Sequence, residues 1–256
     1  MQTRRKVLVG GVLTLFFVDA KIRPCAGFSR PAPHTRGCCL ADEDLNAVYP
    51  PRTPTQAFST GVEPIPSSAN ADFDLALAHT LAKLSDDFQV LPGFAYYDDS
   101  GSKNALATPH TRMDRADGTV LMGKTLLLDL IDRLESPEVA IAGVCAHEFG
   151  HIVQFRHNLI PIVNRDQPNV RNSELQADYF AGYFAGLRKR ERPTFPAAVI
   201  AMTVSGFGDT AFNDRNHHGT AQERGAAVVQ GFEASFRQNK SLSEAIQDST
   251  TYVLGL

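Results

Sequence analysis

The sequence predicts an α+β fold that is mainly helical, with a small sheet placed before the most apolar helix of the chain. Three observations support this class. Apolar residues recur at helical spacing over most of the chain after Asn70, three short apolar runs between 94 and 122 have the length of strands, and the C-terminal part carries repeated helix-start signals. A chain of 256 residues is long enough for one sizeable domain with an extension.

The N-terminal segment has the pattern of a targeting sequence and is not expected to be part of the folded domain. Arg4, Arg5 and Lys6 precede the apolar run 7–18, and Val18-Asp19-Ala20 offers the small residues of a cleavage site. The run is shorter than the roughly 20 residues that cross a bilayer as a helix. We therefore expect a signal peptide over 1–20 that resembles a twin-arginine export signal, with an ordinary secretory signal and an uncleaved anchor as alternatives. Either signal would make the protein periplasmic or secreted.

The next segment, residues 21–69, predicts a proline-rich linker or pro-segment. Eight of the fifteen prolines fall between Pro24 and Pro66, where periodic apolar patterning is weak. The folded domain is expected over residues 70–256, with no transmembrane span in the mature chain.

The first half of that domain is expected to contain two helices and three strands. Apolar residues at helical spacing predict one helix from about Asn70 to Phe88 and another over 126–134. Short apolar runs separated by Gly, Asp and Ser turn residues predict strands over 94–97, 105–108 and 119–122.

The second half is expected to be helical throughout. Ser136-Pro137-Glu138 supplies an N-cap candidate, a proline at the first helical position and an acid in the first turn, and a largely apolar buried helix follows. A loop with Pro161 and Pro168 leads to a second apolar helix over 172–187. Further helices are expected after Pro196 and after the capping boxes at 220–223 and 241–244.

Residues 147–151 read His-Glu-Phe-Gly-His, and this motif predicts a metal site. Two histidines four apart share a face of a helix, so both imidazoles can bind one ion, with Glu148 beside the open coordination position. A solvated helix that carries two histidines by chance suits the apolar surroundings badly, because buried imidazoles need partners. We expect one catalytic Zn²⁺ bound by His147 and His151, with Glu148 as general base.

Two residues compete to be the third ligand of a catalytic zinc. His157 follows His147 by ten residues, a spacing that needs a glycine to break the helix, but Gln154 occupies that place. A continuous helix would put His157 about 15 Å along the axis from His147. Glu174 is favoured instead, because it begins a helix face with small residues, Ala181 and Ala185, that allow close packing. A solvated Glu174 near a helix N-terminus is the alternative.

Asp178 stands one helical turn beyond Glu174. Its carboxylate is placed to accept the remaining ring N–H of a ligand histidine, which orients the ring and raises its basicity.

The chain resembles the gluzincin metallopeptidases, and within them the bacterial neutral zinc metallopeptidase-like proteins. The resemblance rests on His147-Glu148-x-x-His151, on Glu174-Leu175-Gln176-Ala177-Asp178, and on His218-Gly219-Thr220-Ala221-Gln222-Glu223-Arg224, and it covers residues 140–235 or so. It implies a zincin-like domain with a small mixed sheet before the motif helix. It also implies zinc ligands His147, His151 and Glu174, the base Glu148, and Asp178 as the residue that orients a ligand.

The resulting functional expectation is a zinc-dependent endopeptidase that acts on a peptide or protein substrate. A zinc hydrolase of another amide or ester, and a protein that binds a metal or a partner without turnover, are the alternatives. His218 is the candidate second electrophile that stabilises the oxyanion, and a histidine that caps the following helix is the competing interpretation. The sequence does not predict the oligomeric state.

Charge and cysteine content add further expectations. A net charge of −3 without a basic stripe makes nucleic acid an unexpected partner. Cys145 is expected to be a small core residue. Cys25, Cys38 and Cys39 lie in the leader, where one disulfide is possible, and one thiolate there is a candidate fourth zinc ligand that would keep the enzyme latent.

Overall fold

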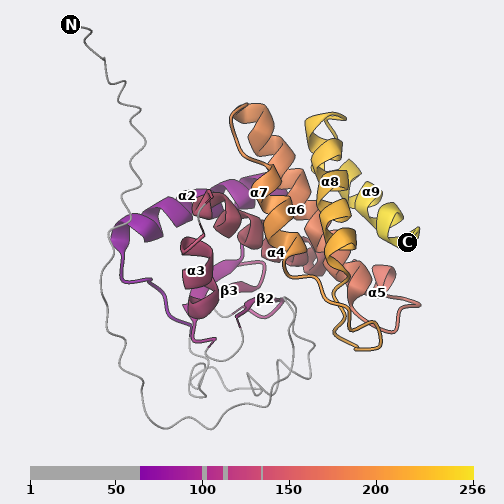
Figure 1. Ribbon diagram of the computed structural model, residues 1–256, viewed down its shortest axis with the longest axis horizontal. Coiled ribbons are helices and arrows are strands. Elements are labelled where there is room, and N and C mark those ends of the chain that lie inside the picture. The colour runs from indigo at the N-terminus through magenta and orange to yellow at the C-terminus, as the bar shows by residue number, and fades with distance from the viewer. Residues whose placement is uncertain (1–63, 100–102, 112–114, 134) are drawn as a thin grey trace, which may run out of the picture. The chain divides into compact units, whose positions relative to one another are not determined.

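The computed structural model describes residues 64–99, 103–111, 115–133 and 135–256 (Figure 1). The expected signal peptide, nearly all of the expected linker and the three leader cysteines lie outside these residues. Within them the fold is mainly helical with one small mixed sheet, so the predicted α+β class is confirmed.

The sheet has three strands in the order β1-β3-β2. Strand β1 (Gly93–Tyr97) pairs in parallel with β3 (Thr119–Gly123), and β2 (Ala105–Thr108) pairs antiparallel with β3 on its other side. The three strands match the predicted runs 94–97, 105–108 and 119–122 to within one residue. Strand β2 is therefore an edge strand, and among the described residues no further strand pairs with its outer edge.

Helix α2 (Ala71–Phe88) begins where the sequence predicts it. Asn70 is its N-cap, and the Asn70 side chain accepts a hydrogen bond from the backbone N–H of Phe73. Before this helix, Ile65 forms an isolated antiparallel bridge with Tyr96 at the outer edge of β1.

Helix α3 (Lys124–Ile131) follows β3 directly and is shorter than the predicted helix over 126–134. The side chain of Asp99 accepts hydrogen bonds from the backbone N–H groups of Thr125, at 2.6 Å, and Leu126, at 3.0 Å. These N–H groups at the start of the helix have no hydrogen-bond acceptor within it. Asp99 therefore acts as their acceptor.

Helix α4 (Pro137–Arg156) is the central element of the fold. All of its residues from 139 to 154 are buried, as the sequence predicts for an apolar helix. It contacts α2, α3 and the strands β2 and β3, and it also contacts two later helices, α6 (Arg171–Glu191) and α7 (Ala198–Ser205). Ser136 occupies the N-cap position, but it has a left-handed backbone (φ 44°) and its side chain caps nothing. A side-chain cap requires an extended backbone at this position, which Ser136 does not adopt.

Five helices complete the chain. They are α5 (Ile160–Val163), α6 (Arg171–Glu191), α7 (Ala198–Ser205), α8 (Ala221–Phe236) and α9 (Leu242–Leu254). The short α5 falls where a loop was expected. Both predicted capping boxes are formed, by Thr220 with Glu223 at α8 and by Ser241 with Glu244 at α9.

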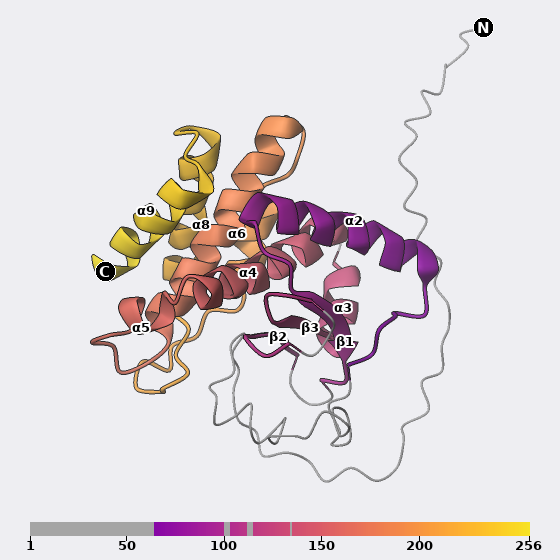
Figure 2. The ribbon, with the colours of Figure 1, turned by 180° about the vertical axis from the view of Figure 1, so that it is seen from behind.

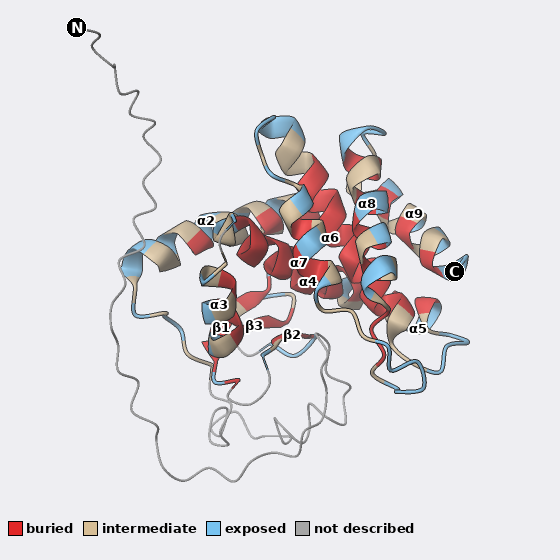
Figure 3. Ribbon diagram, viewed as in Figure 1, coloured by how far each residue is buried: buried red, intermediate tan, exposed pale blue. Residues whose placement is uncertain are grey.

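The helices sort into two groups around α4 (Figure 2). The sheet lies with α2 and α3 on one side of α4, and α6, α8 and α9 lie on the other. Buried residues concentrate along α4 and α6, where the main core sits (Figure 3). Among the described residues, no helix is both long enough and apolar enough to cross a membrane.

The contact between α6 and α8 is unusually close because each helix presents glycine to the other. A Cβ added at Gly182 would stand 1.9 Å from the carbonyl oxygen of Val228, and one added at Gly231 would stand 1.8 Å from that of Tyr179. Both obstacles are backbone atoms, so the helices have to separate to accept a methyl group. The two glycines therefore set the distance between α6 and α8.

Gly182→Ala should destabilise the protein by about 1–3 kcal/mol, the usual cost of overpacking a close contact. Without that contact the substitution would gain up to about 1 kcal/mol of helix propensity, so the sign of the change is diagnostic. Urea unfolding measures the free energy.

The matched control is Gly225→Ala on α8, where an added Cβ meets only the side chain of Ser205. This variant should change stability by less than the Gly182 variant. Equal or greater stability of Gly182→Ala than of the parent protein would contradict the inferred helix contact.

Candidate metal centre

Helices α4 and α6 bring His147, His151 and Glu174 together. The helices can approach because Gly150 lies between the two histidines, where a Cβ would stand only 3.0 Å from the Cα of Ala177. The Nε2 atoms of the histidines are 3.2 Å apart, and that of His147 is 3.4 Å from Oε2 of Glu174 while that of His151 is 3.4 Å from Oε1. All three side chains are buried, and they form the one candidate metal-binding group of three found among the described residues.

These separations fit the geometry of a zinc site. Donor atoms at two corners of a tetrahedron, each about 2.0–2.1 Å from its centre, lie about 3.3–3.4 Å apart. The closest separations are near this value, although the two histidines approach different oxygens of Glu174, and a set of two imidazoles and one carboxylate is a known zinc ligand set. The residues present therefore fit a tetrahedral ion with one position left for an exchangeable ligand.

The hydrogen bonds around His147 fix which of its nitrogens is free for the ion. Nδ1 lies 2.7 Å from Oδ1 of Asp178. A carboxylate only accepts, so Nδ1 must carry the proton and donate it. The lone pair is then on Nε2, which faces His151 and Glu174. Burial lowers the pKa of His147, but its contacts with Asp178 and Glu174 together raise the pKa above its usual value.

A chain of amides fixes His151 in the same way. The Nε2 group of Gln154 donates to the backbone carbonyl of Ser173, at 2.7 Å, and to Oε1 of Gln176, at 3.1 Å. The remaining atom, Oε1 of Gln154, therefore faces Nδ1 of His151 at 2.8 Å and accepts its proton. The lone pair of His151 is again on Nε2. Gln176 in turn donates to Ser249 and Thr250 of α9.

Two imidazole lone pairs and a carboxylate thus point at one buried space. Burial raises the pKa of Glu174, but the neighbouring His151 and His218 and its contact with His147 hold the pKa well below the usual range. Glu174 is therefore ionised. Acceptors facing one another in a dry interior repel, and a cation between them converts that repulsion into attraction.

Charge balance favours a bound cation. Glu148, Glu174 and Asp178 are carboxyl groups with no exposed surface, and Arg224 is the one Lys or Arg that is buried among the described residues. Counted as ionised, three carboxylates and one guanidinium leave two negative charges, which one dication neutralises. A buried excess of this size is costly unless it is compensated.

Arg224 reaches the site from α8. Its Nε donates to Oδ2 of Asp178 at 2.8 Å, and its Nη2 donates to Oδ1 at 2.9 Å. The same Nη2 is 4.0 Å from Glu174. The bidentate contact holds Asp178 in the orientation in which it accepts the proton of His147. The orientation of His147 therefore depends on the position of α8.

The other histidines of interest lie in two different places. His157 is the C-cap of α4 and is exposed, so the continuous helix carries it away from the buried cluster, as the helix geometry predicts. His218 is buried and close enough to Glu174 and His147 for their charges to interact. Desolvation, aided by Arg224 and His147, lowers the pKa of His218.

Asp209 organises the loop before α8. Its carboxylate lies 2.5 Å from Nδ1 of His217 and accepts hydrogen bonds from the backbone N–H groups of His218, at 2.9 Å, and Ala211, at 2.8 Å. Burial raises the pKa of Asp209, but these donors lower it to about 2. Nε2 of His217 is buried and has no hydrogen-bond partner among the described residues.

The sequence analysis did not predict the roles of three residues that orient the candidate ligands: Gln154, Gln176 and Arg224. Each was visible in the sequence. Gln154 and Gln176 each stand within three residues of a predicted ligand, and Arg224 belongs to the motif that begins at His218. What the sequence lacks is the hydrogen-bond direction that gives them a role. Cys145, expected in the core, is buried with a free thiol, and burial raises its pKa to about 12.

Comparison with protein-family models, with curated proteins and with solved structures finds no match to this chain. The resemblance to gluzincins therefore rests on the motifs alone and remains a prediction.

Glu174→Ala should lower zinc affinity strongly, because it removes one of three donors, whereas His157→Ala should leave it unchanged. Competition with a chromophoric chelator measures both constants. The reverse ranking would mean that another ligand set holds the ion.

Asp178→Asn should weaken zinc binding by about 10–100-fold, the usual effect of altering a group that orients a ligand. The new amide NH₂ would face either Arg224 or His147, both of which donate. Asp166→Asn is the control, since Asp166 is exposed in the loop before α6. If both variants bind zinc like the parent, the inferred orientation of His147 is wrong.

Proposed function

We propose that this protein is a zinc-dependent peptidase. The observation that carries the proposal is the convergence of two imidazole Nε2 atoms and the Glu174 carboxylate at tetrahedral spacing, with a buried Glu148 on the same helix as both histidines. His147, His151 and Glu174 would hold the ion. When bound, zinc lowers the pKa of a coordinated water towards 7 and polarises a carbonyl group.

The remaining steps belong to side chains of this chain. Glu148 accepts a proton from the attacking water and returns it to the nitrogen of the departing amine, so its carboxylate is regenerated in each cycle. Asp178 and Gln154 keep the two imidazoles in one tautomer throughout. A purely structural zinc site would need neither a base nor an open position.

A role for His218 as oxyanion donor remains part of the proposal. Burial lowers the pKa of His218 even though the charge of Glu174 acts to raise it, and the lowered pKa favours a neutral imidazole, which can still donate one N–H. The adjacent His217 has a comparable claim, because Asp209 fixes its Nδ1 and leaves Nε2 buried without a partner among the described residues.

The edge strand β2 is the place we propose for a peptide substrate. Gly123 donates to the carbonyl of Asn104, so the alternation of an antiparallel ladder turns the backbone groups of Ala105 and Ala107 away from β3. Ala105 and Ala107 are buried in this structure, so an extended peptide would pair with these groups as a further strand only after this edge is uncovered. Strand β2 also contacts α4, the helix that carries His147 and Glu148.

Glu148→Gln should bind zinc like the parent protein but lose about 10²–10⁴-fold in peptide hydrolysis, the usual contribution of a general base. A quenched fluorescent peptide, assayed with and without chelator, measures turnover, and chelator competition measures zinc affinity.

Glu138→Gln is the matched control, because Glu138 is an exposed residue of the same helix. Undiminished hydrolysis by Glu148→Gln would refute the mechanism. Chelator-sensitive cleavage of esters without cleavage of peptides would assign the protein to another class of zinc hydrolase, and zinc binding without any turnover would assign a binding role.

A further inference from the structure

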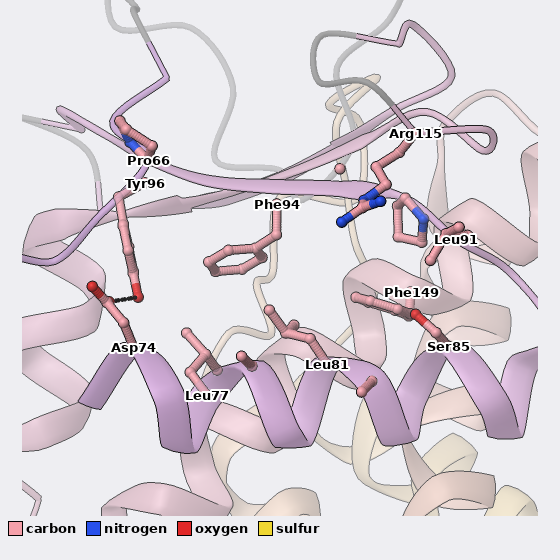
Figure 4. Close-up of a pocket in the computed structure, with 14 residues that line it drawn as sticks. Pro66, Asp74, Leu77, Leu81, Ser85, Leu91, Phe94, Tyr96, Arg115 and Phe149 are labelled. Atoms are coloured by element: carbon pink, nitrogen blue, oxygen red, sulfur yellow. Dashed lines mark hydrogen bonds between the residues drawn. The ribbon is translucent and has the colours of Figure 1, made fainter. Parts of the chain in front are cut away.

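A cavity of about 630 Å³ adjoins helix α4 (Figure 4). Phe149 lines it, and Phe149 is two residues from both His147 and His151. At 100° per residue this places Phe149 on the opposite face of the helix. The cavity is therefore separate from the candidate metal centre, and its volume is within the range of small-molecule sites.

The cavity is a groove between α2 and β1. From α2 it takes residues at positions 74, 77, 78, 81, 82 and 85, which form one helical stripe. The stripe includes the small residues Ala78 and Ala82, which leave room above the helix, and Phe94 of β1 covers the middle of the groove from the other side. Over that stripe the groove is about 16 Å long.

The two ends of the groove differ in charge. At one end Asp74 is satisfied by this chain, because its carboxylate accepts hydrogen bonds from Ser67, from the backbone of Ser68 and from the hydroxyl of Tyr96. At the other end Arg115 lies beside Leu91, is exposed, and forms no ion pair with any described residue. The groove thus offers an available cation at one end only.

The hydrogen-bonding groups of the groove walls indicate whether a peptide or a hydrocarbon chain binds there. The helical side of the groove offers side chains only, because the backbone groups of α2 are bonded within the helix. At the β1 side the backbone N–H and C=O of Tyr96 are already paired with Ile65. A peptide backbone laid along α2 would therefore find no backbone partner on the helix, whereas a hydrocarbon chain needs none.

We propose that this groove binds a single-chain amphiphile with an anionic head group, with the head at Arg115 and the chain running along α2 towards Tyr96. A long-chain carboxylate is the simplest ligand of this class. The site is independent of the proposed peptidase function, because it lies on the other face of α4.

Dodecanoate is the probe, titrated into the full-length protein by calorimetry below its micelle concentration. One saturable site is expected. Arg115→Gln should weaken binding about 3–10-fold, in keeping with a partly solvated ion pair. Ala78→Phe, which fills the groove, should weaken it more than 10-fold. Butanoate should not bind, and dodecyltrimethylammonium should bind more weakly than dodecanoate.

Two variants serve as matched controls. Arg165→Gln removes an exposed arginine from another loop, and Ala71→Phe adds the same side chain to α2 outside the groove. Both should bind dodecanoate like the parent, as should Glu148→Gln, whatever its effect on hydrolysis. Absence of saturable binding, or equal affinity of the parent and both groove variants, would overturn the proposal. So would equal or tighter binding of the cationic amphiphile.

Discussion

The buried contact between Arg224 and Asp178 is the interaction on which the candidate centre depends, because it joins three helices at one carboxylate. Arg224 comes from α8, Asp178 from α6, and the imidazole that Asp178 orients comes from α4. A buried ion pair is weak evidence for stability, since desolvation offsets most of the attraction. Its value here lies in alignment. With both oxygens of Asp178 engaged by Arg224, the acceptor that faces His147 has no freedom to rotate away.

That alignment is possible only because small residues shorten the distances between the helices. Gly150 lets α4 approach Ala177 of α6, and Gly182 and Gly231 let α6 approach α8. A helical glycine costs about 1 kcal/mol relative to alanine when nothing packs against it. At these positions the methyl group of alanine would instead strike backbone or separate the helices, and the donor atoms of the centre would move apart with them. The glycines thus lower the intrinsic stability of each helix but allow the helices to pack closely.

Much of this arrangement could be predicted from the sequence, and the limits of that prediction have a physical cause. Helix spacing, turn residues and capping boxes located the three strands and most of the helices, because those signals are local. The expectation that His147, His151 and Glu174 meet in space also needed only helix periodicity and the chemistry of zinc ligands. The role of Arg224 needed the packing of α8 on α6, which depends on contacts between residues far apart in the chain. The left-handed Ser136 and the short α5 were missed for a related reason, since both depend on how the chain connects helices rather than on the helices themselves.

Gln154 illustrates the difference between excluding a role and finding one. Its presence in place of a helix-breaking glycine argues that His157 is not a ligand, and α4 indeed continues past it to Arg156. The same side chain accepts the ring proton of His151 and is itself held by Ser173 and Gln176. One residue thus keeps the helix intact and sets the tautomer of a histidine within it. Because Gln176 is bonded in turn to Ser249 and Thr250, the C-terminal helix is connected to the candidate centre through amide groups whose directions are all determined. A shift of α9 would therefore change the hydrogen bond that orients His151, although no residue of α9 is a candidate ligand.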